Sequence, residues 1–455
     1  MTDRKINLLT DPIAPAMIKM AAGMLFGFIA MSAFNAADTY FVGQIGTSQL
    51  AAMSFTFPVV LILNSLALGL GTGLSSTVSR AIGSGNHHKV QRLTTDGLML
   101  SVLIVIVFAI AGIATIDPLF KLLGARGETL TLIRKYMIIW YFGTPFVVIP
   151  MAGNNVIRAT GDTLTPSMIM IVSVVTNIIL DPLLIFGIGP FPALGIAGAA
   201  IATVFARFIT FLFSLYILTF REKFISFQIE GFSEIISSWN EIAFIGVPAA
   251  LIQAINPLSL SIITHLLARF GEKVVAGFGA AGRIEMLVMI IPMSLSTVMA
   301  PFAGQNWGAK QPERIGKALR FASSVSVGWG LVVFAAAQFF AEPVLRLFNA
   351  DPVIVQAGSS YLKIITVSYG LLGVLFMSSQ SFNALNRPFH AAGIILTKAL
   401  LLNIPLAYAG AHFFMENGIF AATLTANVLT GIFGFIFFQL FLKRNSPIQV
   451  SGDRA

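Results

Sequence analysis

Three acidic side chains lie deep within apolar stretches of the sequence. Asp181 interrupts TNIILDPLLIFGIG, Asp38 lies in SAFNAADTYFVGQIG, and Glu285 lies in AAGRIEMLVMIIP. If these stretches cross a bilayer, each carboxylate costs a few kcal/mol, about 2.5 to 3.5 kcal/mol on insertion scales. Residues that carry such a cost are by default candidates for ion or substrate binding.

The residues around Asp181 favour a polar pocket. Asn177 precedes it by four residues, so the two side chains share one face of a helix, and Pro182 leaves a backbone carbonyl without its donor. With Asp38 these groups can bind a proton, because burial and a neighbouring like charge both favour a neutral carboxyl group. Their oxygens also suit Na⁺. In the alternative interpretation, Asp38 and Asp181 lie at span ends, contact water and only orient helices.

Composition supports the bilayer. The chain has 455 residues, of which 56% are hydrophobic and 10% charged, and its mean hydropathy is +0.86. Apolar runs of about 20 residues recur throughout, the length that crosses a hydrocarbon core, and they are continuous rather than alternating, unlike barrel strands. We therefore expect an all-α polytopic membrane protein. The net charge of +9 is spread over loops, so it indicates topology rather than binding to nucleic acid.

The apolar pattern predicts twelve transmembrane helices. The expected spans are residues 13–42, 50–76, 95–116, 132–154, 165–187, 194–218, 240–268, 274–303, 318–340, 356–380, 391–412 and 418–442. We divide them into an N-lobe at residues 1–218, a cytoplasmic linker at 219–239 and a C-lobe at 240–455.

With both termini cytoplasmic, sixteen basic residues lie in inner segments and seven in outer loops. This bias predicts that orientation in a bacterial inner (plasma) membrane.

The two halves are internal repeats. Pro118–Ala125 aligns with Pro343–Ala350, and at the same spacing Tyr136 aligns with Tyr361. Each half holds six spans, so both begin on the same side of the membrane. The repeats are therefore parallel and related by a pseudo-twofold axis along the membrane normal, an arrangement typical of transporters.

Several motifs resemble those of the multidrug and toxic compound extrusion (MATE) family. Besides TNIILDPLLIF, the motifs are ADTYFVGQIGTSQLAA, VSRAIGSGN, NNVIRATGDTLTPSM, GIAGAAIATV and APFAGQNWGAK, in this order along nearly the whole chain. The resemblance implies twelve helices in two lobes and outward drug export driven by inward H⁺ or Na⁺. It also implies a cation site in the N-lobe, matched here by Asp38, Tyr136, Asn154, Asn177, Asp181 and Thr203.

The C-lobe departs from part of the family. Some members carry acidic cation ligands in the seventh and tenth helices, whereas the seventh span here offers Gln253 and Asn256 and the tenth has no acid. We therefore place ion coupling in the N-lobe. Glu285, with Gln253 and Asn256, is expected to line the substrate cleft, and Lys398 in the eleventh span has no evident partner in the sequence.

The predicted function is an H⁺-coupled multidrug antiporter that works by alternating access and acts as a monomer. Its partners are the lipid bilayer and small-molecule drugs, chiefly organic cations, and it needs no cofactor beyond the coupling ion. One alternative is Na⁺ coupling, with the ion at Asp38, Asn177, Asp181 and Thr203. Another is a lipid or lipid-linked sugar flippase of the same superfamily. An enzyme is disfavoured because the sequence has no HExxH motif and no nucleophile elbow.

Overall fold

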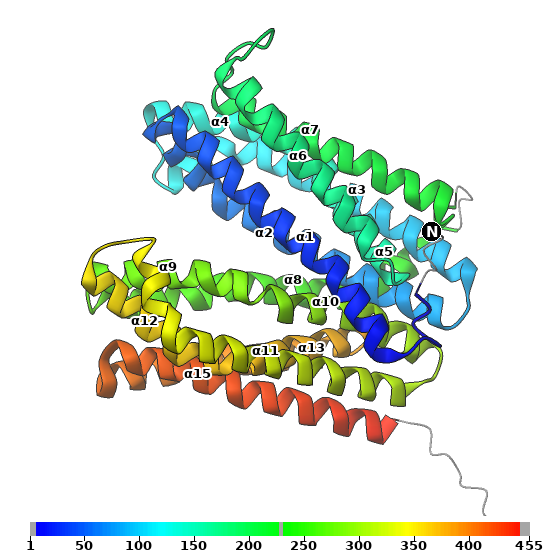
Figure 1. Cartoon of the computed structure of the whole chain (residues 1–455). Helices are drawn as coiled ribbons and strands as arrows, with labels where there is room; N and C mark the ends of the chain where they lie inside the picture. Colours follow the sequence, from blue (N-terminus) through cyan, green and yellow to red (C-terminus); the bar gives the residue numbers. More distant parts are fainter. Residues whose placement is uncertain (1–5, 227–230, 446–455) are drawn as a thin grey trace, which may run out of the picture. The chain divides into compact units, whose positions relative to one another are not determined.

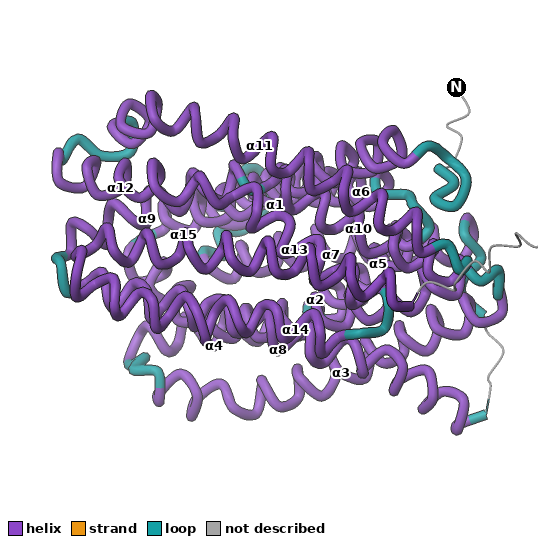
Figure 2. Tube along the Cα trace, turned by 90° about the horizontal axis from the view of Figure 1, so that it is seen from below, coloured by secondary structure: helices purple, strands orange, loops and turns teal. Residues whose placement is uncertain are grey.

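The computed structural model describes residues 6–226 and 231–445, without the side chains of Asn35, Ala36, Asp38, Thr39, Thr47 and Leu50. In this part of the chain every regular element is a helix, as Figure 2 shows. The helices before the central loop are α1 (Ile13–Ile45), α2 (Thr47–Gly83), α3 (His87–Leu122), α4 (Gly127–Gly143), α5 (Pro145–Ala159), α6 (Leu164–Phe186) and α7 (Ile196–Tyr216), which the π-helix η1 (Ile217–Arg221) extends.

The second half is also built of helices, coloured from green to red in Figure 1. It contains α8 (Phe232–Ala268), α9 (Glu272–Val288), α10 (Ile290–Gly308), α11 (Pro312–Arg346), α12 (Pro352–Ile365), α13 (Tyr369–Ala384), α14 (Pro388–Leu396) and α15 (Ile404–Asn445). Two short elements join them: the 3-10 turn η2 (Thr366–Ser368) and the π-helix η3 (Thr397–Asn403).

The helices account for the twelve predicted spans. In the described chain, nine helical stretches are long and apolar enough to cross a membrane, and two bent pairs add two more: α4 with α5, at 41°, and α9 with α10, at 48°. The stretch Pro388–Asn445 is broken inside α15, where Met415 has a φ of 54°, and counts as two spans. Pro145 begins α5 and Pro292 lies in the first turn of α10, where the missing N–H of proline allows the bend.

Residue contacts divide the chain into two compact units. Unit 1 contains Lys19–Ala254, and unit 2 contains Asn7–Ile18 together with the described residues from Ile255 onward. The division passes through α1 and α8, whereas the sequence places a linker at residues 219–239. Residues 227–230 of that linker lie outside the described part of the chain.

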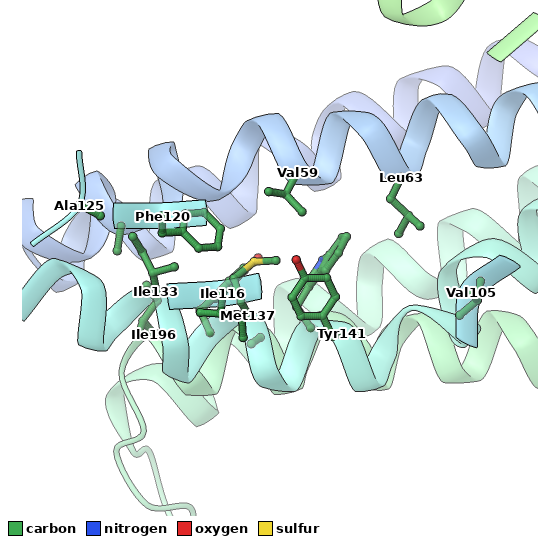
Figure 3. Close-up of a cluster of buried hydrophobic side chains, with 14 of the residues drawn as sticks. Val59, Leu63, Val105, Ile116, Phe120, Ala125, Ile133, Met137, Tyr141 and Ile196 are labelled. Carbon is green, nitrogen blue, oxygen red and sulfur yellow. The ribbon is translucent and has the colours of Figure 1, made fainter. Parts of the chain in front are cut away.

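One of the buried hydrophobic clusters of unit 1 lies mainly between α2, α3 and α4. Figure 3 shows Val59 and Leu63 of α2 pointing toward Met137 and Tyr141 of α4, and all four are nearly or fully buried. A Cβ atom at Gly112 of α3 would lie 2.2 Å from Tyr141 Cε1, so α3 approaches α4 this closely because residue 112 has no side chain.

The helix boundaries repeat at the spacing that the sequence predicts. The first residues of α3 and α11 are separated by the same number of residues as Tyr136 and Tyr361. The first residues of α4 and α12 have this separation too. α2 ends at Gly83 and α10 at Gly308, again with the same separation. Tyr136 of α4 and Tyr361 of α12 therefore occupy equivalent positions in the two units.

Candidate functional site

The centre of the candidate site is a buried pair on α6. Asn177 Nδ2 donates a hydrogen bond of 3.1 Å to Asp181 Oδ1, and both side chains are fully buried. Pro182 follows directly and has no N–H to donate to the carbonyl of Ile178, so that carbonyl loses its helical partner. A carboxylate, an amide and a free carbonyl thus lie on one turn of a membrane-spanning helix.

α1 runs parallel to α6 and carries Asp38 past this turn. The Thr163 hydroxyl donates to the Met20 carbonyl at 2.8 Å. Further along, Phe34 clusters with Val174, and Val42 clusters with Ile185.

Residue 38 lies midway between Phe34 and Val42, and Asn177 and Asp181 lie between Val174 and Ile185. The α1 backbone at residue 38 is therefore level with the buried pair, although the Asp38 side chain lies outside the described part of the structure.

α7 runs antiparallel to α6 and brings Thr203 to the same level. Ser173 Oγ of α6 donates to the Ala206 carbonyl of α7 at 3.1 Å. A Cβ atom at Gly198 would lie 2.3 Å from the Leu184 carbonyl oxygen, so the helices are in close contact there too. Thr203 lies between these two contacts, opposite Asn177, and its side chain is half-buried.

The other two predicted members are buried on neighbouring helices. Tyr136 of α4 is 5% exposed and packs in the cluster that contains Ala200 of α7, one turn from Thr203. Asn154 of α5 is also 5% exposed, and its amide oxygen has no hydrogen-bond partner among the described residues. Its neighbour Gly153 packs against Ser214, about three turns along α7 from Thr203.

Sequence reasoning missed one charged residue near this site. The Arg207 guanidinium of α7 lies 4.5 Å from the centroid of the Phe34 ring, one turn before Asp38 along α1. A basic residue inside an apolar span, as in IATVFARFITF, is itself a signal, because it carries the same burial cost as an acid.

Unit 2 holds a second group of polar side chains. The Tyr361 hydroxyl of α12 donates a hydrogen bond of 2.6 Å to Glu285 Oε2 of α9, and Lys398 of η3 interacts electrostatically with the same carboxylate. Glu285 is therefore the electrostatic partner of Lys398, which the sequence alone did not identify. Gln253 is half-buried on α8 in unit 1, and Asn256 is exposed on α8 in unit 2. The cleft predicted from Glu285, Gln253 and Asn256 remains a prediction.

Comparison with known proteins identifies the family. A sequence model of the MatE family matches residues 24–183 and 248–409. The chain belongs to this family. A FAD transporter of Shewanella oneidensis is 39% identical over 432 residues, which are 95% of each chain. The multidrug export protein MepA of Staphylococcus aureus is 26% identical over 436 residues, again 95% of each chain.

Solved structures agree with this assignment. The MATE transporter VcmN of Vibrio cholerae, in its bent form, matches with a TM-score of 0.90 at 29% identity, over 95% of this chain and 97% of that chain. The resemblance seen in the motifs and the all-helical fold with twelve spans are both confirmed. This MatE protein is thus a multi-pass membrane transporter and not an enzyme.

Proposed function

We propose that this MatE protein is a cation-coupled antiporter that exports its substrate from the cytoplasm while H⁺ moves inward. The observation that carries the proposal is the fully buried Asp181, hydrogen-bonded to Asn177 inside a membrane span. A carboxylate in this position is costly, and protonation removes that cost. Both termini face the cytoplasm in this proposal, and one chain, which contains both units, acts as the transporter.

Protonation changes the hydrogen bonding on α6. The ionised Asp181 accepts from the Asn177 amide, whose own oxygen has no partner among the described residues. A protonated Asp181 gains an O–H donor, and rotation of the Asn177 amide then supplies an acceptor. Protonation of Asp38 and Asp181 from outside would thus alter the contacts of α1, α6 and α7. Coupling requires that this alteration favours one conformation of the transporter over the other.

The Asn177–Asp181 pair favours H⁺ over Na⁺ as the coupling ion. A proton needs one carboxylate oxygen and a hydrogen-bond acceptor, and Asp181 with the rotated Asn177 amide supplies both. Na⁺ held by oxygen atoms of Asp38, Asn177, Asp181 and Thr203 is the alternative.

The proposed substrate is FAD or a related flavin nucleotide. The support is the relative named a FAD transporter, which is 39% identical along 95% of both chains, against 26% for the multidrug exporter MepA. Lys398 is a basic residue inside a span of unit 2 and matches the negative charge of a dinucleotide. Organic cations are the second candidate, favoured by MepA and by the acidic Glu285.

Transport into everted membrane vesicles tests both parts of the proposal. We expect uptake of FAD when the lumen is acidified, no uptake when only a Na⁺ gradient is imposed, and at least a tenfold loss in Asp181→Asn and in Asp38→Asn. Asp117→Asn is the control, because that carboxylate only pairs with Arg134 at an exposed site.

Three other results would change the assignment. Uptake driven by Na⁺ would overturn H⁺ coupling, and full activity of Asp181→Asn would overturn the coupling site. Uptake of ethidium without FAD would move the substrate to organic cations. Transport of neither compound under either gradient would favour the lipid or lipid-linked sugar flippase.

A further inference from the structure

The polar group in unit 2 is held in a fixed geometry. The Tyr361 ring packs edge-on against Phe278 and Phe420, with ring centroids at 4.9 Å and 5.1 Å. These contacts aim its hydroxyl at Glu285, which accepts the hydrogen bond at 2.6 Å. The Tyr369 hydroxyl is buried and makes no hydrogen bond to a described residue. Tyr361 is therefore the phenol that donates to Glu285.

The Lys398 ammonium has fewer hydrogen-bond partners than the Glu285 carboxylate. Its ammonium lies 5.8 Å from the centroid of the Phe376 ring and attracts Glu285 electrostatically. Across the described residues, the ammonium makes no hydrogen bond and no direct ion pair, and its side chain is half-buried. An ammonium has three donors. This one lies within a span and donates none of them to a described residue, so its charge and donors suit an anionic ligand.

Each member of the group lies at an irregular point of a helix or within about one turn of one. Glu285 is one turn before the 48° bend between α9 and α10. Tyr361 and Tyr369 flank the 3-10 turn η2, and Lys398 lies within the π-helix η3. Irregular turns of this kind cost stability and occur often at functional sites. Four polar side chains near three such points favour a built site over scattered packing.

The internal repeat supports the same conclusion. Tyr361 is equivalent to Tyr136, a member of the candidate coupling site in unit 1. In the alignment that places Pro182 on Pro405, Lys398 falls on the counterpart of α6, just before the position of Asn177. Unit 2 thus carries a basic residue near the place where unit 1 carries Asn177 and Asp181.

We propose that Lys398 and Glu285 form a binding site in unit 2 for an anionic group of the transported substrate, occupied together with a proton. The anion binds at the Lys398 ammonium. An ionised Glu285 next to it would repel the anion, so Glu285 takes up a proton as the anion enters and shares it with the Tyr361 and Tyr369 hydroxyls. This inference rests on the proposed export of a flavin nucleotide and names its diphosphate as the group recognised.

The charged and titratable groups around Glu285 are consistent with proton uptake by Glu285 as the anion binds. Tyr361 of α12, Tyr369 of α13 and Lys398 of η3 are the titratable groups that interact with it in the described structure. Arg283 lies on the same helix but is exposed. A cation could displace Lys398 from Glu285 instead, but Glu285 already accepts a hydrogen bond from Tyr361, whereas the Lys398 ammonium donates to no described residue.

Direct binding to the purified protein tests the inference without depending on transport. FAD, riboflavin, which lacks phosphate, and inorganic pyrophosphate are titrated by calorimetry into wild type, Lys398→Gln, Glu285→Gln and the control Arg283→Gln. We expect Lys398→Gln to weaken FAD and pyrophosphate binding at least about tenfold, the effect of losing a charged hydrogen bond, and to leave riboflavin binding unchanged. Thermal unfolding of each variant checks that it is folded.

The pH dependence separates a role in binding from a structural role. FAD binding to wild type should tighten between pH 8 and pH 6, because one proton enters with the anion. Glu285→Gln should bind FAD at least as tightly as wild type and lose most of this dependence. Wild-type binding of FAD and pyrophosphate that Lys398→Gln does not change, or no binding of either compound, would overturn the inference. Lys398-dependent binding of pyrophosphate without transport of FAD would retain the site and reject the flavin substrate.

Discussion

Asp162, in the turn between α5 and α6, shows how a single charge holds a helix end. Its carboxylate accepts hydrogen bonds from the Thr165 backbone N–H at 2.9 Å and the Thr165 hydroxyl at 2.6 Å, and it pairs with Arg221. Burial alone would raise the pKa of Asp162, but these hydrogen bonds and the Arg221 charge outweigh it and lower the pKa below its ordinary value. A lowered pKa stabilises the fold above the unfolded value, about 4, and this stability is lost as the pH falls through the folded value.

Asp162→Asn should therefore destabilise unit 1 by about 1 kcal/mol at pH 7.5, the scale of a lost helix-capping interaction. The measurement is the thermal unfolding midpoint in detergent, compared with wild type at pH 7.5 and at stepwise lower pH. The difference should shrink below about pH 4, where wild-type Asp162 is itself becoming neutral. An equal difference at every pH would assign the effect to shape rather than charge. Asp117→Asn, at an exposed pair with Arg134, should stay near wild type.

Contacts between side chains on one helix turn were predictable from the sequence. Contacts between residues far apart in the sequence were not. Asn177 and Asp181 are four residues apart, so helix geometry alone predicts that their side chains meet. Glu285 and Tyr361 are 76 residues apart, and their hydrogen bond depends on how α9 packs on α12. Lys398 and Arg207 gave a signal in the sequence as basic residues within spans, but the spacing does not indicate their partners.

At the scale of helices, the α9–α12 contact sets the position of Glu285 and Tyr361. A Cβ atom at Gly277 of α9 would lie 2.4 Å from the Ile354 carbonyl oxygen of α12. The contact is with backbone, which cannot move aside as a flexible side chain would. Small residues at such crossings let membrane helices approach closely, so this glycine fixes the distance between the two helices.

Gly277→Val should therefore force α9 away from α12 and cost about 1 to 3 kcal/mol. We expect a lower unfolding midpoint and weaker FAD binding, because the Tyr361–Glu285 hydrogen bond spans the same two helices. Gly279→Val is the matched control, two residues along α9, where a Cβ atom would meet nothing within 4 Å. If Gly277→Val and Gly279→Val have the same unfolding midpoint and the same affinity for FAD, the contact at Gly277 does not position Glu285 and Tyr361.

For the whole molecule, the sequence predicted the repeat and the number of spans but not every break. Duplication shows as motifs repeated at one fixed spacing, and the helices begin at the same spacing. The bends between α4 and α5 and between α9 and α10 lie inside continuous apolar runs, so hydropathy reads each pair as one span. The break at Phe414 and Met415 falls where the sequence places a short loop, at residues 413–417.

Orientation of the whole chain remains a prediction, and the absence of native cysteine makes it directly testable. Leu122 and Leu347 lie at equivalent helix ends of the two repeats, and each is 84% exposed. Since the basic residues favour cytoplasmic termini, both positions should be outside. Ser84, after α2, and Asn445, at the end of α15, should be inside.

Single-cysteine variants at these four positions should therefore label in two groups. In intact cells, a membrane-impermeant maleimide should modify Leu122→Cys and Leu347→Cys, and it should reach Ser84→Cys and Asn445→Cys only after the membrane is permeabilised. The reverse pattern would invert the orientation and, with it, the direction in which protons reach Asp181. Labelling of Leu122→Cys and Leu347→Cys from opposite sides would mean that the first half crosses the membrane an odd number of times. The repeats would then be inverted, and the equivalence of Tyr136 with Tyr361 would lose its geometric basis.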